Sequence, residues 1–385
     1  MLSVALLTSN PAAAGAIEQL LRESIAFNLV FRASPIPGAH EVIRALHTYD
    51  PEVLLLDIGD WDLVSALVLQ IKQIKMRTVT IGFRGTWVRE QQVTFEEAGI
   101  ADLLREPFSS ADLEEAVYQA LHRHQPIANH DILGFLPAKA GSGCSTVALN
   151  TAGALVSQFG SKVLLVECDR RSGALSIMLN VETRNGLTDA LQNAGNMTQL
   201  GWQQCHVNLY GIHIVLANLT RRGSLPSWAE YYQLLRFVGP HYEFVIADLP
   251  EVVNAATAEL VKCARGVFIV CTPEVPSLKL AAQRCMELEE CEISGDKIHI
   301  LLNRWERSQL KLSDIEKSLG RPVFATLPND YKQARQAILE SRLIDPDSRF
   351  ARSCMTLAAK LSGLPEGRRR ESKYSLLRKL ARMTE

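Results

Sequence analysis

The residues with the clearest chemical pattern lie in the segment 132–146, which reads I-L-G-F-L-P-A-K-A-G-S-G-C-S-T. Its apolar first part has the composition of a strand, and its small residues lead into a helical pattern at 147–156. In this context, backbone N–H groups converge on a phosphate and the helix N-terminus adds positive potential. The segment predicts a phosphate-binding loop; the alternative is an ordinary Gly/Ser turn. Cys144 stands where such loops usually carry a lysine.

Two later strand patterns end in carboxylates. The segment 162–169, K-V-L-L-V-E-C-D, ends with Glu167 and Asp169, and the segment 242–250, Y-E-F-V-I-A-D-L-P, contains Asp248 near its end. Both apolar runs are typical of buried parallel strands. An acidic residue in such a position either takes part in chemistry or caps the following helix.

The loop resembles the deviant Walker A motif, K-G-G-x-G-K-[ST]-T, of the MinD/ParA family of P-loop ATPases. In that family the lysine matched by Lys139 reaches across a nucleotide-sandwich dimer to the partner's phosphates. Ala140 replaces a glycine of the motif, and Cys144 replaces its phosphate-binding lysine. The resemblance implies a binding site for ATP made of the loop residues Lys139, Ala140, Gly141, Ser142, Gly143, Cys144, Ser145 and Thr146.

The same resemblance implies a magnesium site and a catalytic carboxylate. Asp248 matches the Walker B aspartate, which would hold Mg²⁺ together with Ser145. Asp169 matches the second aspartate of the family's D-x-D pair, which positions the attacking water, and Lys139 would join it in catalysis. The lysine missing at Cys144 removes a point charge from the β- and γ-phosphates, so we expect weak hydrolysis or none.

Two segments near the end of the ATPase pattern extend the resemblance. Asn303 and Arg304 end the strand I-H-I-L-L-N-R, where MinD-like ATPases have an Asn-Arg whose amide reads adenine. The segment 320–337, G-R-P-V-F-A-T-L-P-N-D-Y-K-Q-A-R-Q-A, resembles the corresponding part of CpaE/TadZ-type pilus-assembly proteins. Those proteins carry an atypical receiver domain ahead of a MinD-like domain, often with an altered P-loop.

Residues 1–125 alternate strand and helix patterns, which predicts a parallel sheet covered by helices on both faces. The segment P-E-V-L-L-L-D ends at Asp57 and resembles the third strand of response-regulator receivers, whose aspartate accepts a phosphoryl group. The acidic pair of receivers is replaced by Ser9 and Asn10, and their Lys-Pro by Glu106-Pro107. Without a Mg²⁺ site and a nearby cation, nothing stabilises the negative charge that develops on a phosphoryl group during its transfer. Asp57 is therefore expected to be a vestigial phosphoacceptor.

The expected architecture is therefore α/β, with two doubly wound parallel-sheet domains. Residues 1–125 form a CheY-like pseudoreceiver, 126–130 a linker and 131–365 a MinD/ParA-like P-loop domain. The strands expected in the first domain are Val4–Thr8, Asn28–Ala33, Val53–Asp57, Thr78–Phe83 and Asp102–Leu104. In the second domain we expect, among others, a helix at Leu187–Gln192, a strand at Ile212–Leu216 and a helix at Trp228–Phe237.

The composition is that of a globular protein with balanced charge. The 385 residues are 47% hydrophobic with a formal net charge of −1, so no global field attracts nucleic acid. The N-terminus reads as a strand rather than a signal peptide, and apolar runs are shorter than a membrane span. The scattered eight cysteines indicate reduced thiols in a cytoplasmic protein. His122 and His124 lack metal-ligand spacing and are expected on the surface.

Residues 366–385 form a basic tail. As a helix it would gather Leu376, Leu377 and Leu380 on one side and Arg378, Lys379 and Arg382 on the other. MinD uses such a helix to bind membrane, so direct membrane contact through 366–385 is one reading; a helix packed on its own protein, or a disordered tail, is the other.

These features favour a nucleotide-binding localisation or assembly factor for a bacterial pilus or secretion machine. It would act as an ATP-dependent homodimeric switch or scaffold, in the cytoplasm or peripherally at the inner membrane or a cell pole. It would have no specific nucleic-acid partner. The alternatives are an active ParA-like ATPase that positions DNA or cargo, a MinD-like regulator of cellulose secretion, and a phosphorylation-controlled response regulator.

Overall fold

The computed structural model describes residues 1–74, 77–127, 131–217, 225–306 and 310–363. The chain divides into two compact units, Met1–Ile127 and Ala128–Glu385. Most of the expected linker 126–130 and the whole basic tail 366–385 lie outside the described residues. No helix of the described ranges is long and apolar enough to span a bilayer.

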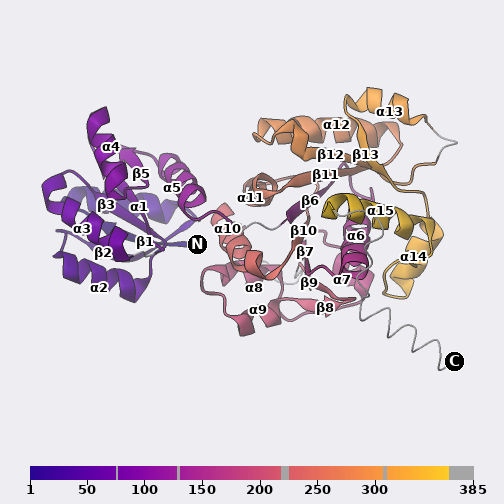
Figure 1. The fold of residues 1–385 in the computed structure, drawn as a ribbon, viewed down its shortest axis with the longest axis horizontal. Coiled ribbons are helices and arrows are strands. Elements are labelled where there is room, and N and C mark those ends of the chain that lie inside the picture. Colours follow the sequence, from indigo (N-terminus) through magenta and orange to yellow (C-terminus); the bar gives the residue numbers. More distant parts are fainter. Residues whose placement is uncertain (75–76, 128–130, 218–224, 307–309, 364–385) are drawn as a thin grey trace. The chain divides into compact units, whose positions relative to one another are not determined.

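The first unit is a five-stranded sheet in the order β2-β1-β3-β4-β5, with every pair parallel (Figure 1). This order is that of flavodoxin-like doubly wound folds. One side of the sheet is packed with apolar residues of α2, α3 and α4, and α1 contacts α5. Its elements are β1 Leu2–Leu7, α1 Pro11–Glu23, β2 Phe27–Ala33, α2 Ala39–Tyr49, β3 Val53–Asp57, α3 Trp61–Ile74, β4 Val79–Arg84, α4 Arg89–Ala98, β5 Asp102–Arg105 and α5 Ser110–His124.

The second unit is an eight-stranded sheet in the order β13-β12-β11-β6-β10-β7-β9-β8. Its strands are β6 Asp131–Pro137, β7 Val163–Glu167, β8 Val207–Leu209, β9 Ile212–Val215, β10 Phe244–Asp248, β11 Gly266–Cys271, β12 Ile298–Leu302 and β13 Val323–Thr326. The central strands β7, β10 and β11 are buried at every residue, as a parallel sheet covered on both faces requires.

One edge of this sheet differs from the expected parallel arrangement. Strand β8 pairs with β9 antiparallel. The two strands are joined by Tyr210 and Gly211, which both have positive φ, at 56° and 78°. Two consecutive left-handed residues make the tight turn of a hairpin, and a hairpin forces antiparallel pairing. Sequence inspection missed β8 because it is only three residues long.

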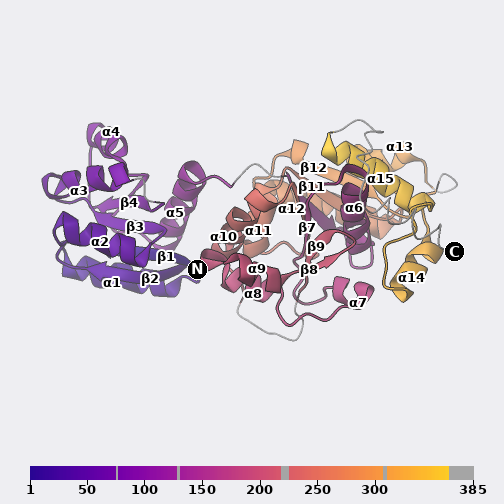
Figure 2. The same cartoon turned by 60° about the horizontal axis from the view of Figure 1, so that its bottom comes forward.

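The helix that follows the glycine-rich loop, α6, is enclosed. Its side chains pack on the sheet and on α15, forming one apolar core with α7 and α14. Figure 2 shows α11 and α12 across the sheet from α6. The helices of the second unit are α6 Cys144–Phe159, α7 Leu175–Leu179, α8 Leu187–Gln192, η1 Ala194–Asn196, α9 Gln199–Cys205, α10 Trp228–Val238, η2 Gly239–His241, α11 Ala255–Cys263, α12 Val275–Glu290, η3 Gly295–Lys297, α13 Leu312–Leu319, α14 Tyr331–Leu339 and α15 Arg349–Ser362.

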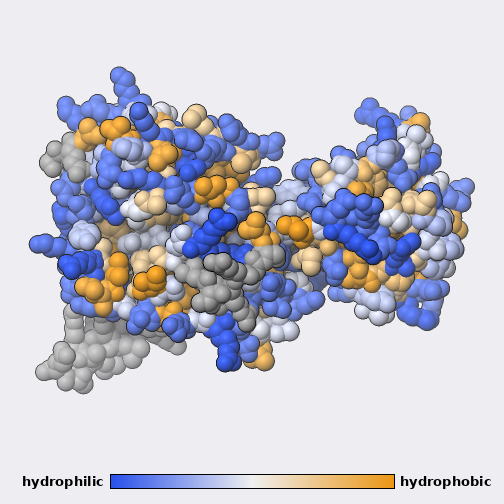
Figure 3. Space-filling model, turned by 180° about the vertical axis from the view of Figure 1, so that it is seen from behind, coloured by the Kyte–Doolittle hydropathy of each residue, from blue (hydrophilic) through white to orange (hydrophobic). Residues whose placement is uncertain are grey.

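The surface carries apolar side chains in small groups. Ile177, Val252, Val275 and Leu339 are each more than half exposed. On the face drawn in Figure 3 apolar residues form small patches between hydrophilic ones. Isolated apolar residues of this kind are normal on soluble proteins.

Candidate phosphate-binding site

The glycine-rich loop lies at the carboxyl end of β6, in the middle of the sheet. β6 pairs with β10 on one side and β11 on the other. Gly141 and Gly143 have φ angles of 78° and 87°, a region that a residue with a Cβ adopts only under strain. Helix α6 begins directly after Gly143, and no side chain caps it. Its first N–H groups are therefore left for an anion, which is the arrangement that the loop sequence predicts.

Ser145 and Asp248 lie together, as expected for a magnesium site. Asp248 ends β10, is 4% exposed, and accepts hydrogen bonds from the side chains of Ser145 and Cys144. Burial, with a smaller contribution from the negative charges of Glu167 and Asp169, raises the pKa of Asp248 to about 7, although the two hydrogen bonds lower it in part. A carboxylate beside a hydroxyl supplies the hard oxygen ligands that Mg²⁺ prefers, so these residues fit the ion.

Cys144 points inward rather than toward the position of a phosphate. It is 6% exposed, belongs to the apolar core around α6, and its thiol donates to the carboxylate of Asp248. Burial and the neighbouring Asp248 hold the pKa of this thiol well above its usual value, so it stays neutral. The side chain at this position therefore contributes no positive charge to the loop.

The side chains of Asn303 and Arg304 both donate hydrogen bonds to carbonyl groups of the loop. The Asn303 amide donates to the Ser142 carbonyl over 2.8 Å, and the Arg304 guanidinium donates to the Gly141 carbonyl over 3.0 Å. A Cβ on Gly143 would lie 2.5 Å from the Asn303 amide nitrogen, so a glycine is required there. Arg304 has a φ of 58°, which is strained for a residue with a side chain. The expected adenine contact is thus occupied by the loop itself in this structure.

Two glutamates that sequence inspection missed also contact the loop. Lys139 forms an ion pair with Glu274 over 2.8 Å, and the Ala140 N–H donates to the Glu251 carboxylate over 3.0 Å. The hydrogen bond and positive charge of Lys139 lower the pKa of Glu274. A signal existed in the sequence: each glutamate directly follows a proline at the end of a strand pattern.

The two carboxylates after β7 have structural partners. Glu167 is fully buried and accepts hydrogen bonds from the N–H groups of Leu175 and Ala217, at 2.7 and 2.8 Å. Burial raises the pKa of Glu167, and these N–H groups lower it in part. The Asp169 carboxylate accepts the N–H groups of Arg171 and Ser172, both at 2.9 Å. It closes the turn after β7 and does not cap the following helix α7, whose N-cap residue is Ala174.

Two further residues of the loop, Ser142 and Thr146, differ in how their polar groups are bonded. The Ser142 side chain is 1% exposed, and its hydroxyl has no hydrogen-bond partner. Thr146 lies in the first turn of α6, where its carbonyl accepts the Asn150 amide over 2.8 Å. The other Asn150 amide atom, its oxygen, accepts the N–H of Ile344 over 3.0 Å and so ties α6 to the chain before α15.

In the first unit, the Asp57 carboxylate is fully engaged by its own chain. One oxygen accepts the Thr8 hydroxyl over 2.7 Å and the Ser9 N–H over 3.2 Å; the other accepts the Gly59 N–H over 2.9 Å. Burial and the charge of Asp57 raise the pKa of Glu106. Neutral donors and a second acid thus surround Asp57, where phosphoryl transfer would need cations.

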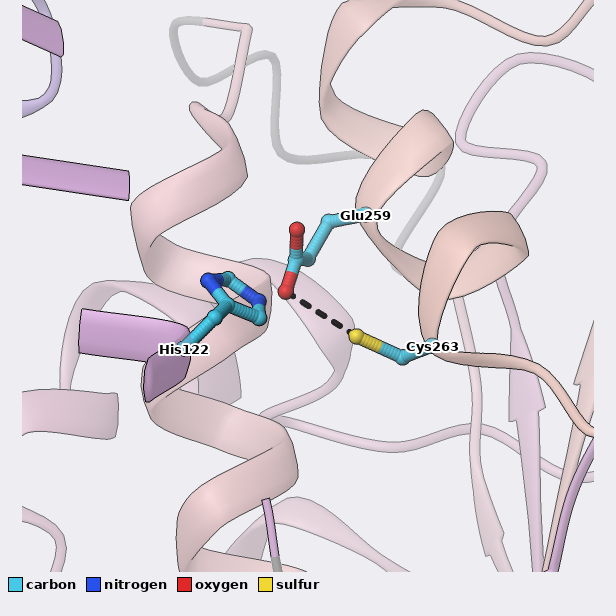
Figure 4. Close-up of side chains that lie close together, drawn as sticks. All are labelled: His122, Glu259 and Cys263. Atoms are coloured by element: carbon cyan, nitrogen blue, oxygen red, sulfur yellow. Dashed lines mark hydrogen bonds between the residues drawn. The ribbon is translucent and has the colours of Figure 1, made fainter. Parts of the chain in front are cut away.

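The cysteines are free thiols, and most are buried. Figure 4 shows Cys263 of α11 with its sulfur 3.1 Å from the carboxylate of Glu259, one turn earlier on the same helix. Burial and this carboxylate raise the pKa of the Cys263 thiol. A thiol whose pKa is raised in this way is a poor nucleophile near neutral pH.

Comparisons with known proteins find related ATPases. No family model matches the chain. It is 24% identical over 236 residues to the septum site-determining protein MinD of Thermotoga maritima, covering 58% of this chain and 85% of the relative. An uncharacterised ATP-binding protein of Methanocaldococcus jannaschii is 26% identical over 250 residues, covering 63% and 91%.

A solved structure shares the fold of the second unit. The ParA family ATPase of Chlorobium tepidum TLS matches with a TM-score of 0.55 at 22% identity, covering 60% of this chain and 99% of that one. Relatives and structural neighbour together support a relationship to the MinD/ParA-like P-loop ATPases.

Proposed function

We propose that the chain is a nucleotide-binding positioning or assembly factor that uses ATP with Mg²⁺ as a switch or scaffold ligand. The observation that carries this proposal is the pairing of an uncapped α6 N-terminus with Ser145 and Asp248 beside it. The relatives named as septum site-determining and ATP-binding proteins support it.

Each residue of the proposed site has a separate role. The N–H groups at the start of α6 receive the phosphates, and Ser145 and Asp248 hold Mg²⁺, which when bound neutralises phosphate charge. Cys144 adds no charge, so turnover is slow or absent. Asp169 would orient water, and Asn303 with Arg304 would face the base after leaving their loop contacts. Lys139 would leave its ion pair with Glu274 and contact the phosphates of the nucleotide bound in a second subunit.

The wider role rests on the architecture. A receiver-like first unit whose Asp57 is already engaged serves docking or dimerisation rather than phosphorylation. This combination favours the CpaE/TadZ-type role in a pilus or secretion machine, at the inner membrane or a cell pole. The second candidate is an active ParA-like ATPase that positions DNA or cargo; it needs fast hydrolysis, which the neutral Cys144 disfavours.

Titration of MgATP into the purified full chain tests the proposal, with sedimentation of the same samples. Binding coupled to dimer formation is expected, and a following assay of phosphate release separates a scaffold from a motor. No heat of binding at millimolar MgATP would overturn the proposal and leave a scaffold whose loop is vestigial.

Replacing Lys139 with alanine is expected to weaken ATP-dependent dimerisation by about tenfold or more. A lysine that crosses the interface contributes a charge-assisted contact to phosphate, and losing such a contact costs about 1.5–3 kcal/mol. Sedimentation equilibrium with MgATP measures the effect. Lys317→Ala on the exposed side of α13 is the control. An unchanged dimerisation constant for Lys139→Ala would rule out the cross-subunit contact.

Deleting residues 366–385 is expected to abolish sedimentation of the protein with anionic liposomes. The segment's basic and apolar residues fit an interfacial helix, whose binding combines charge attraction and apolar burial. The matched control is the full chain with neutral liposomes, which should bind less. Equal binding of full and shortened chains would show that the tail is not a membrane anchor.

A further inference from the structure

Four consecutive loop residues are each held by a side chain from another strand end. The contacts are Lys139 with Glu274, Ala140 with Glu251, Gly141 with Arg304, and Ser142 with Asn303. Two of these contacts reach loop carbonyls, and one reaches a side chain. The Glu251 contact differs, because among these four it alone occupies a backbone N–H.

A carboxylate on a loop N–H has the chemistry of a bound phosphate oxygen. Glu251 Oε2 lies 3.0 Å from the Ala140 nitrogen. Phosphate-binding loops hold their ligand through backbone N–H groups of this kind. The protein therefore places an anion of its own in the loop, and an incoming anion must compete with it for the Ala140 N–H.

The structure also offers the carboxylate a second position. Arg284 of α12 forms an ion pair with Glu287 over 2.5 Å through its Nη1, and its Nη2 lies 3.6 Å from Glu251 Oε1, just beyond hydrogen-bond distance. The Arg284 side chain is only 11% exposed, and its buried Nε has no hydrogen-bond partner. A small rotation of Glu251 away from Ala140 would bring its carboxylate onto the free side of this guanidinium, which Glu251 would then share with Glu287.

We propose that Glu251 is a built-in competitor of the nucleotide: it closes the phosphate-binding loop when no ligand is present and moves to Arg284 when a polyphosphate takes the Ala140 N–H. This inference rests on the proposed nucleotide-binding function. It predicts that the loop binds polyphosphate less tightly than its backbone geometry allows, because part of the binding free energy is used to displace Glu251.

Two substitutions distinguish the effect of the hydrogen bond between Glu251 and the Ala140 N–H from the effect of the negative charge of Glu251 alone. Glu251→Ala removes the carboxylate, and Glu251→Asp keeps the charge but shortens the reach by one methylene. Glu290→Gln, an exposed glutamate at the end of the same α12 that carries Arg284, is the matched control. Calorimetry with MgATP and with inorganic pyrophosphate, on the full chain, gives the dissociation constants. Amide hydrogen exchange of the 137–143 segment reports the state of the loop without any ligand.

Both Glu251 variants are expected to bind MgATP and pyrophosphate about tenfold more tightly than the wild type and Glu290→Gln. Both are also expected to exchange the loop amides faster. If Glu251→Asp has the wild-type dissociation constants while Glu251→Ala binds more tightly, the negative charge at position 251 alone weakens binding. That result would rule out Glu251 as a competitor for the Ala140 N–H. If all variants bind with one dissociation constant, the inference fails while the proposed function stands. If none binds either ligand, both fail.

Discussion

Replacing Cys144 with lysine is expected to tighten MgATP binding by about ten- to a hundredfold and to raise the rate of ATP hydrolysis. A lysine there would add the charge-assisted contacts to phosphate that Cys144 lacks, and one such contact is worth about 1.5–3 kcal/mol. The new ammonium would also lie near the Asp248 carboxylate, which now has only the neutral Ser145 and Cys144 side chains as hydrogen-bond partners.

The design needs two matched variants, because Cys144 belongs to the core around α6. Cys144→Ala keeps a small side chain without charge and should leave binding near the wild-type level. Cys144→Met adds length without charge and controls for the strain of a longer side chain. Calorimetry and a phosphate-release assay read out the effect, with thermal unfolding as a check of folding. A well-folded Cys144→Lys protein with unchanged affinity would show that the loop does not hold phosphates.

The second large effect concerns stability. The pKa of Asp248 is about 7 in the folded chain, against about 3.9 for a free aspartate. Between these values the folded state binds the proton more tightly than the unfolded state. The free energy of unfolding is therefore expected to fall as pH rises from about 4 to 7, by about 4 kcal/mol, and then to stay level.

Asp248→Asn should remove most of this dependence, because the amide stays neutral while its oxygen still accepts hydrogen bonds. Urea unfolding at pH 5, 6, 7 and 8, at constant ionic strength, measures it. We expect the variant to be more stable than the wild type above pH 7 and no more stable at pH 5. Glu167, also buried with a raised pKa, leaves a smaller slope of the same sign.

The control for this series is Asp314→Asn, an exposed carboxylate on α13. It should keep the wild-type slope. If Asp248→Asn and the wild type show parallel curves, the buried carboxylate is not the source of the pH dependence. The same protonation implies that Mg²⁺ must displace a proton from Asp248 below pH 7, so Mg²⁺ affinity should rise with pH in that range.

Much of the architecture was predictable from local patterns. The five strands of the first unit and their alternation with helices follow from short apolar runs between amphipathic segments. The helix Leu187–Gln192 was predicted with the same ends as α8. Strands β7 and β10 lie within the segments 162–169 and 242–250 that were predicted as buried strands, and they end at the acidic residues Glu167 and Asp248. In each case the signal lies within a few neighbouring residues.

The contacts of the loop were not predictable in this way. Glu251 and Glu274 lie 111 and 135 residues from the loop residues they contact, so only the folded sheet brings them there. The inward direction of Cys144 depends on the burial of α6 against α15, which no local pattern reveals. Resemblance identified Asn303 as a site residue, but only the structure shows its amide bonded to the loop.

The enclosure of α6 has a consequence for how the chain is made. The loop is translated early, yet its supports arrive late: Glu274, then Asn303 and Arg304, and finally α15 at Arg349–Ser362. Until α15 leaves the ribosome, one side of α6 has no packing partner, whereas Met1–Ile127 is already complete as a unit. A nascent chain stalled before Arg349 would present a finished first unit joined to a second unit in which α6 lacks the cover of α15.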